Sequence, residues 1–194
     1  FTWKSDGSTI ANPPAAVDNI SLTSNLPGNF ISVATGNWGD AATWDANAVP
    51  TSGDNVTVST GNAVTINATG QAANNLTIDG TLAYGTTPTS FAVGGNLNVN
   101  AGGVLNVFSG TTGKTLNIAG NIVNNGTIDL SVGTTTAGNL TLNGSTVQNI
   151  SGTGSFNNGF IRNLTFSNTA TATPNINWDI NNIKVAYNLN LTGA

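Results

Sequence analysis

Three aspartates have the spacing that a carbohydrate-cleaving site on a repetitive fold would use. Asp79, Asp129 and Asp179 each lie on or beside a predicted strand, at intervals of 50 residues. Glycoside hydrolysis needs two carboxylates that face one another across the scissile bond. If each interval spans two coils of a repeat, these groups lie roughly 10 Å apart even on a shared face. They are the carboxylates to test for the alternative function, a polysaccharide-active enzyme.

Other catalytic chemistry lacks the residues that it needs. The chain contains no His and no Cys, so neither a Ser-His-Asp nor a Cys-His site can be assembled. A polysaccharide lyase would need a basic residue supported by Ca²⁺ or by arginine, and Arg162 is the only arginine. We therefore predict that the chain is not an enzyme, and we assign no catalytic, cofactor-binding or metal-binding residues.

A second group of aspartates lies closer to the N-terminus. Asp40, Asp45 and Asp54 fall within a short stretch, and carboxylates are ligands that Ca²⁺ prefers. A Ca²⁺ site needs about six to eight oxygen atoms, and neither an EF-hand spacing nor a glycine–aspartate nonapeptide repeat is present. We expect these side chains to cap turns, with a bound Ca²⁺ ion as the alternative.

The composition excludes several classes of partner. Only 6% of residues are charged, and the formal net charge is −4. Four Lys and Arg in total cannot neutralise a run of phosphates, so nucleic acid is not an expected partner. No apolar run approaches the length of about 18 residues that a membrane helix needs, so membrane insertion is not expected. The absence of Cys suits an exported protein, and the start at Phe1 suggests that an export signal has been removed.

A repeated phrase predicts the elements that position these side chains. An Asn or Thr is followed six times by an apolar–polar–apolar triplet, with leading leucines 21, 19, 24, 24 and 25 residues apart. The six copies begin at Asn75, Asn96, Thr115, Asn139, Asn163 and Asn188. A repeat of this period is typical of a stacked solenoid. Turn dipeptides such as Asn125-Gly126 leave a meander of antiparallel hairpins as the alternative.

The repeat predicts an all-β fold, a single-stranded parallel β-helix with about six to seven coils of about 22 residues. Alternation places Leu76 and Ile78 inside the coil. A second strand is expected in each coil, at 64–66, 82–84, 104–107, 127–130 and 147–150. Such a rod is about 30 Å long, with a right-handed wind as the default. We expect the Asn of each phrase to join a ladder of stacked amides, an exposed ligand-binding array being the alternative.

Residues 1–50 differ from the repeats and are assigned to an N-terminal cap. They hold three of the four tryptophans, Trp3, Trp38 and Trp44, which we expect to plug the first coil. Residues 51–194 are assigned to the parallel β-helix. No cap follows the last phrase, so we expect the native β-helix to continue beyond the C-terminus. An open last coil would be a site of end-to-end self-association.

The segment that joins the cap to the repeats resembles a known family. It reads Gly36-Asn37-Trp38-Gly39-Asp40-Ala41-Ala42-Thr43-Trp44, then Val49-Pro50-Thr51-Ser52-Gly53-Asp54-Asn55-Val56-Thr57-Val58 and Gly61-Asn62-Ala63-Val64-Thr65-Ile66. It resembles the N-terminal β-helix region of large secreted or surface adhesin-like proteins of Bacteroidetes, many of them exported by type IX secretion. It is also similar to the eight-glycine domain. The resemblance covers residues 36–80 and carries over no catalytic residue.

These observations favour a structural or adhesive module of an exported bacterial cell-surface protein. We expect a stiff β-helical rod for surface attachment or presentation, either secreted or on the extracellular face of the outer membrane. The expected partners are glycans or other surface and secretion components, and no cofactor is expected. The alternative is a polysaccharide-active β-helix enzyme or a carbohydrate-binding module.

Overall fold

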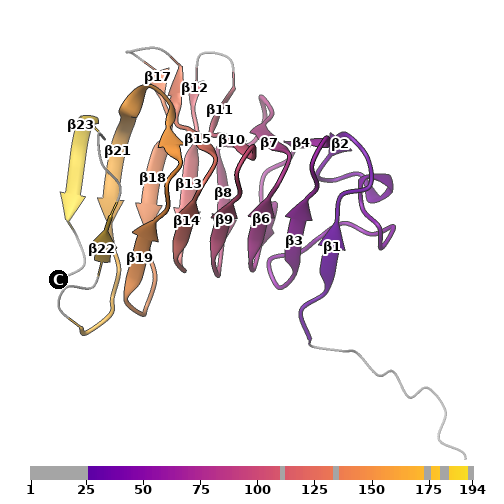
Figure 1. The fold of residues 1–194 in the computed structure, drawn as a ribbon, viewed down its shortest axis with the longest axis horizontal. Helices are drawn as coiled ribbons and strands as arrows, with labels where there is room; N and C mark the ends of the chain where they lie inside the picture. Colours follow the sequence, from indigo (N-terminus) through magenta and orange to yellow (C-terminus); the bar gives the residue numbers. More distant parts are fainter. Residues whose placement is uncertain (1–25, 110–111, 133–135, 173–175, 180–183, 192–194) are drawn as a thin grey trace, which may run out of the picture.

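The chain forms a stack of short parallel strands. The computed structural model describes residues 26–109, 112–132, 136–172, 176–179 and 184–191. Within these ranges, three parallel sheets are wound into a β-solenoid of about six turns with almost no helix. Figure 1 shows the strands following one another along the long axis. The predicted parallel β-helix is confirmed, and its right-handed wind stays a prediction.

A full turn contributes one strand to each sheet. The first sheet contains β1 (Asn29–Ile31), β3 (Asn55–Val58), β6 (Leu76–Ile78), β9 (Leu97–Val99), β14 (Ile122–Asn124), β19 (Gln148–Ser151) and β22 (Ile176–Trp178). The second contains β2 (Gly36–Asn37), β4 (Ala63–Ile66), β7 (Thr81–Tyr84), β10 (Val104–Asn106), β15 (Thr127–Asp129) and β20 (Ser155–Phe156). The third contains β5 (Ala72–Ala73), β8 (Ser90–Val93), β13 (Thr115–Ile118), β18 (Asn139–Leu142), β21 (Phe160–Phe166) and β23 (Lys184–Leu191). Two 3-10 helices, η1 (Ala41–Thr43) and η2 (Asn157–Gly159), interrupt the turns.

Alternation of buried and exposed residues within most of the strands builds the core. In β6, Leu76 and Ile78 are fully buried, and Thr77 between them is partly exposed. The parallel register stacks Leu76 on Val56 of β3 and on Leu97 of β9. Such columns of apolar side chains run along the solenoid, so each coil depends on its neighbours to bury its own residues.

Each complete coil has three strands, where the sequence predicted two. The repeated phrase serves two sheets: its first two copies are in the first sheet and its last four are in the third, at Leu116, Leu140, Leu164 and Leu189. The change falls at the 19-residue interval between Leu97 and Leu116, which is shorter than a full coil. A strand is present at the predicted position 147–150, but this strand, β19, belongs to the first sheet and not to the second. In all three sheets a strand follows a turn and alternates apolar with polar residues. The repeated phrase alone therefore does not show to which sheet a strand belongs.

The antiparallel meander is wrong as a description of the fold, although two local hairpins are present. β11 (Phe108–Ser109) pairs with β12 (Thr112–Gly113), and β16 (Ser131–Val132) pairs with β17 (Thr136–Ala137). Each hairpin lies between a second-sheet strand and the following third-sheet strand, so it enlarges one corner without changing the register of the coil. β12 lies beside β17, and Figure 1 shows both hairpins at the upper edge of the molecule.

Residues 26–50, from the region assigned to the cap, close the N-terminal end. β1 and β2 pair with β3 and β4 in parallel, so this segment also supplies the first strands of two sheets. Trp38 and Trp44 are buried, with ring centroids 5.0 Å apart, and Trp38 lies 4.9 Å from the ring of Phe91. The Trp44 indole N–H donates to the carbonyl of Trp38 at 2.8 Å. Trp3 lies outside the described residues.

Glycines form a column where the first sheet turns into the second. A Cβ built on Gly126 would overlap the carbonyl oxygen of Gly103, and one built on Gly154 would overlap the carbonyl oxygen of Gly126. Successive coils approach so closely at this corner that only a residue without a side chain fits. The column therefore fixes how tightly the coils are stacked.

Candidate functional site

The most regular polar feature is a row of asparagines on the outward face of the first sheet. This first asparagine row consists of Asn29, Asn55, Asn75, Asn96, Asn121, Asn149 and Asn177. The Asn75 amide donates to the Asn55 side-chain oxygen at 2.8 Å, and that of Asn177 donates to the Asn149 oxygen at 2.8 Å. In the middle of the row, backbone N–H groups donate to the same oxygens, as from Asn96 to Asn75 at 2.8 Å. The predicted amide ladder is confirmed.

A second row lies on the third sheet. Asn163 donates to the Asn139 side-chain oxygen at 2.7 Å, and Asn188 donates to Asn163 at 3.0 Å. At the other end of the row, Asn139 donates to the Thr115 hydroxyl at 3.2 Å. The sequence predicted one ladder and the structure has two, because the repeated phrase is divided between two sheets.

The two rows act first as structural clamps. In both rows, every side-chain oxygen except that of the last residue accepts a hydrogen bond from the next coil, so the amides reinforce the backbone ladder from one coil to the next. This geometry favours the structural interpretation over a free ligand-binding array. Asn96, Asn149 and Asn177 are nevertheless exposed, so the same row also presents uncharged donors and acceptors to solvent.

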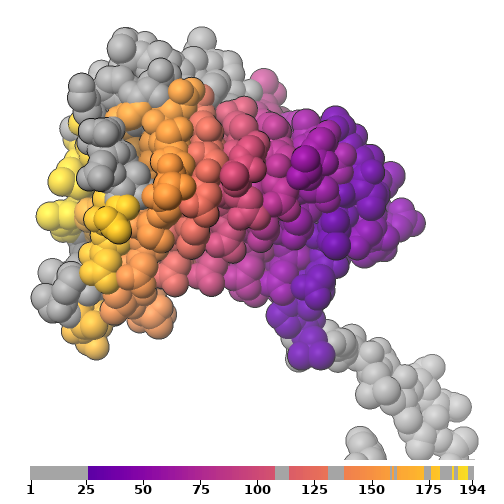
Figure 2. All heavy atoms as spheres, viewed as in Figure 1, coloured from indigo at the N-terminus to yellow at the C-terminus, as the bar shows by residue number. Residues whose placement is uncertain are grey.

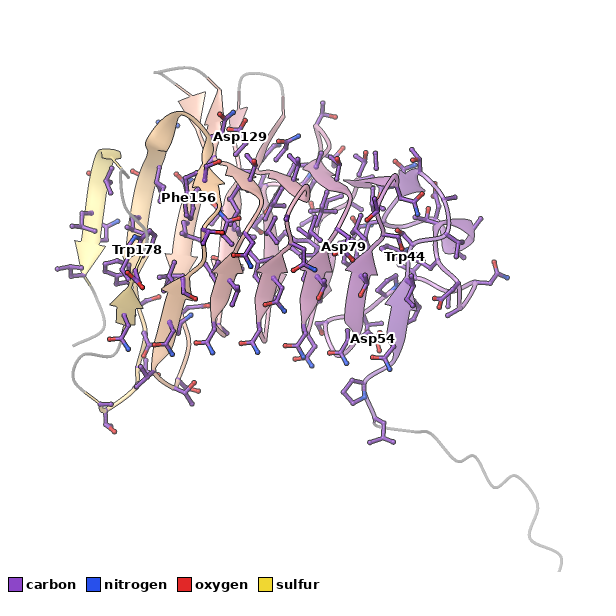
Figure 3. The ribbon with its side chains drawn as sticks, in the orientation of Figure 1. Trp44, Asp54, Asp79, Asp129, Phe156 and Trp178 are labelled. Carbon is purple, nitrogen blue, oxygen red and sulfur yellow. The ribbon has the colours of Figure 1, made fainter. Side chains whose placement is uncertain are left out.

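The three aspartates proposed for polysaccharide chemistry do not come together. Asp79 follows β6 and Asp179 follows β22, which are four strand-to-strand steps apart, or about 19 Å. Asp129 ends β15 in the second sheet, and Figure 3 shows it well separated from Asp79. Asn100 donates to Asp79 at 2.6 Å, and Asn157 donates to Asp129 at 2.6 Å. Asp79 and Asp179 are therefore too far apart to flank one glycosidic bond.

Asp45 and Asp54 cap turns, as the sequence predicted, whereas Asp40, at the start of η1, makes no side-chain cap hydrogen bond. Asp45 accepts backbone N–H groups from Ile31 at 2.9 Å and from Ala46 at 2.8 Å. Asp40 accepts the Asn37 amide at 2.9 Å, within the turn that precedes η1. In the described part of the chain, no group of three or more His, Cys, Asp or Glu side chains is arranged to hold a metal ion.

Asp54 connects the N-terminal segment to the first full coil. Its carboxylate accepts hydrogen bonds from Gly28 N at 2.8 Å, Thr51 N at 2.8 Å and the Thr51 hydroxyl at 2.7 Å. Partial burial alone would raise the pKa of Asp54, but these hydrogen bonds to the charged form outweigh it and lower the pKa below its ordinary value of 3.8. The ionised carboxylate therefore favours the folded state.

Charged residues gather at the corner that carries the hairpins, a feature that the sequence analysis missed. Lys114, which precedes β13, is 2% exposed, and its ammonium group donates to the Thr86 carbonyl at 2.8 Å. Asp129 in the next coil is 9% exposed, and Arg162 lies on β21 in the coil after that. Lysine next to a strand normally indicates an exposed position, so no sequence signal identifies this burial. Hydrogen bonds at this corner join neighbouring coils, from Lys114 to Thr86 and from Asn157 to Asp129.

The geometry defines a class of protein: a parallel β-solenoid with side-chain ladders on its outward faces. The G8 domain family matches residues 43–161, more than half of the chain, and the chain belongs to that family. No curated protein and no solved structure matches it. The Bacteroidetes origin, type IX export and eight-glycine pattern suggested by the sequence stay predictions. Across the described ranges, no helix combines the length and apolar composition required to cross a membrane.

Proposed function

We propose that the chain is the solenoid module of an exported bacterial surface protein, a stiff rod for attachment or presentation at the cell exterior. The observation that carries the proposal is the continuous parallel register of the first sheet from β1 to β22, reinforced by the first asparagine row. Six strand-to-strand steps at about 4.8 Å give a stack roughly 29 Å long. Bending it would disturb backbone and side-chain hydrogen bonds together, which favours stiffness.

The family and the shape of the molecule support a structural role. A G8 domain on a β-solenoid fits an extracellular structural module. Figure 2 shows the coils stacked in sequence order, from the indigo N-terminal coil towards the yellow C-terminal one. A stiff module of this kind would act as a spacer that holds other parts of a surface protein at a fixed distance along its axis.

Uncharged glycans are the partner class that we propose for the outward face of the first sheet. Beside the first asparagine row, this face presents Thr57, Thr77 and Asn98 in register, all partly exposed. Hydroxyl and amide groups at regular intervals can pair with sugar hydroxyls. Lys114 is buried, which leaves even fewer cations for phosphates or acidic polymers and supports excluding nucleic acid.

A glycan array with matched variants tests the binding proposal. The double variant Thr77→Val with Asn98→Leu removes hydrogen-bonding groups from the first sheet and preserves side-chain size. The control, Asn117→Leu with Thr141→Val, makes the same changes at adjacent positions of the third sheet. We expect the wild type to bind at least one uncharged glycan, the first variant to bind at least tenfold more weakly, and the control to bind normally. Absence of glycan binding, or equal effects of both variants, would refute the assignment.

We propose an exterior location for the protein, which labelling of intact cells tests independently of any ligand. An antibody to the chain should stain intact cells of the source organism or detect the protein in the medium. Protease added outside the cells should remove the signal. Staining that requires permeabilised cells would refute the exported location.

We also propose that the chain has no polysaccharide-cleaving activity of its own. The distance between Asp79 and Asp179, together with the position of Asp129 on another sheet, supports this proposal. Incubation with a panel of polysaccharides and chromatographic analysis of the products should reveal no cleavage. A product that forms with the wild type and is lost on converting the three aspartates to Asn would overturn it.

A further inference from the structure

The outward face of the third sheet carries short uncharged side chains in two straight columns. β13, β18 and β21 pair in parallel and in register, and each contributes one residue to either column. The third-sheet array, as we name these residues, consists of Thr115, Asn117, Asn139, Thr141, Asn163 and Thr165. All six are partly exposed, whereas Leu140 and Leu142 between and beside them are buried. Lys114 and Arg162 lie beside the array, outside its two columns.

Hydrogen bonds along the first column hold its side chains in place. Asn163 donates to the Asn139 side-chain oxygen at 2.7 Å, and Asn139 donates to the Thr115 hydroxyl at 3.2 Å. An Asn amide has two N–H donors and an oxygen with two lone pairs, so each of these bonds leaves capacity for solvent. Side-chain ladders also favour a flat sheet. A face that is already fixed in one arrangement loses little conformational entropy when it binds.

The first sheet lacks an equivalent pair of columns. Asn75 and Asn96 precede β6 and β9, and their side-chain oxygens accept backbone N–H groups of the next coil at 2.8 Å. These amides therefore turn into the corner, whereas Asn139 and Asn163 lie within strands. The other column of the first sheet is interrupted by Val123, which pairs with Asn98. The first sheet thus provides a matched control surface with similar residue types.

The spacing of the third-sheet array matches that of ordered water. Water molecules that hydrogen-bond at about 2.75 Å in a tetrahedral network have second neighbours about 4.5 Å apart. Equivalent residues on neighbouring strands repeat every 4.8 Å, approximately. If the lattice is centred on β18, the residues of β13 and β21 are displaced from it by about 0.3 Å, which is within the spread of O–H···O lengths. Waters bound to all three strands can therefore belong to one lattice.

We propose that the third-sheet array binds the surface of ice. Its hydroxyl and amide groups can hydrogen-bond water molecules that are part of the crystal, at equivalent positions on successive coils. No charged side chain belongs to the array, so binding does not remove the hydration shell of an ion, which would be costly. A crystal surface repeats in two dimensions, as the array does, whereas a soluble sugar chain repeats in one. Ice between bound molecules can grow only with a curved front, which lowers its freezing temperature.

Thermal hysteresis, the gap between the melting and freezing temperatures of one ice crystal, tests the proposal with the purified chain. The wild type should give a measurable gap and should become enriched in a growing ice shell when it carries a fluorescent label. Thr141→Tyr places an uncharged ring above the plane of the array, so both effects should be lost. Thr165→Tyr repeats this test on the neighbouring strand.

The control is Thr77→Tyr, the same change at a partly exposed position of the first sheet. It should leave the hysteresis and the enrichment in ice unchanged. Near-ultraviolet circular dichroism checks that all three variants remain folded. Equal losses in the control and in the third-sheet variants would overturn the proposal, as would a wild-type chain without either effect. Retention on crystalline cellulose or chitin without any effect on ice would assign the array to polysaccharide and overturn it as well.

The inference goes beyond the proposed function, and the two fail separately. Ice binding is measured on the purified chain, whereas the exterior location is measured on intact cells. A chain that stains intact cells but does not bind ice leaves the surface module in place. A chain that binds ice but is found only inside cells would have the opposite meaning.

Discussion

Replacing Gln148 with leucine tests how interior polar groups support the solenoid. The side chain is fully buried where the third sheet turns into the first. Its oxygen accepts hydrogen bonds from Gly144 N at 2.9 Å and from the Asn168 amide at 2.8 Å. Its nitrogen donates to the carbonyls of Ile118 at 3.0 Å and Gly120 at 2.7 Å. One amide therefore joins the segments that follow β13, β18 and β21.

The expected cost comes from the groups that lose their partner. Leucine has nearly the volume of glutamine, so the cavity contribution is small. The Ile118 carbonyl keeps a backbone donor, and the Asn168 amide keeps a carbonyl acceptor. Gly144 N and the Gly120 carbonyl lose the amide that serves them, at about 1–3 kcal/mol each. We expect the free energy of unfolding to fall by roughly 2–6 kcal/mol.

Guanidinium unfolding followed by circular dichroism measures this loss. The matched control is Asn143→Leu, which also replaces a side-chain amide with leucine, at an exposed position five residues earlier. The control should alter the free energy of unfolding by no more than about 0.5 kcal/mol. If Gln148→Leu costs less than about 1 kcal/mol with an unchanged denaturant slope, the buried amide does not join the coils as we infer.

Three further perturbations test other parts of the structure. Gly126→Ala should lower the free energy of unfolding by about 1–3 kcal/mol, because its Cβ would overlap the Gly103 carbonyl oxygen. Gly53→Ala, whose Cβ would have its nearest contact at 3.8 Å, should change the free energy of unfolding little. Equal effects of the two variants would contradict the close approach of coils at the glycine column. Asp54 has a lowered pKa, so its stabilising contribution is present above pH 3.8 and is lost as the pH falls through the lowered pKa. The melting temperature of the wild type should therefore fall more between about pH 7 and pH 2 than that of Asp54→Asn, and identical losses would exclude this role. Phe91→Ala should cost about 3–5 kcal/mol and shift tryptophan emission to longer wavelengths; unchanged emission would argue against its packing on the indole.

The stacked architecture could be predicted because its signal is repeated. Alternation around Leu76 returns at a period too long for one hairpin, and the structure places these residues in parallel columns. The asparagine ladder followed from the same reasoning, since identical residues at one register position must lie one above another. Turn capping by Asp45 and Asp54 was also accessible, because short polar side chains accept backbone N–H groups in turns.

The number of strands per coil could not be predicted from the phrase. In later coils the first sheet uses Ile122 and Ile150, whose surrounding sequences depart from the phrase that marks Leu76 and Leu97. Strands of all three sheets share the same local sequence pattern. Only the way in which each coil closes in three dimensions decides which sheet a strand joins. The buried Lys114 was missed for another reason: its burial depends on how neighbouring coils meet at a corner, which no local pattern encodes.

The corner that carries the hairpins has a consequence for the variability of this fold. From Asn55 to Asn75 one circuit of the chain takes 20 residues, whereas from Asn121 to Asn149 it takes 28. The longer coil includes β16 and β17, yet β14 still pairs in parallel register with β9 of the preceding coil and with β19 of the following coil. Additional residues at this corner therefore leave the strand pairing of the coils unchanged. Foreign peptides inserted at this corner could be displayed at defined positions along the solenoid axis without redesign of the strands.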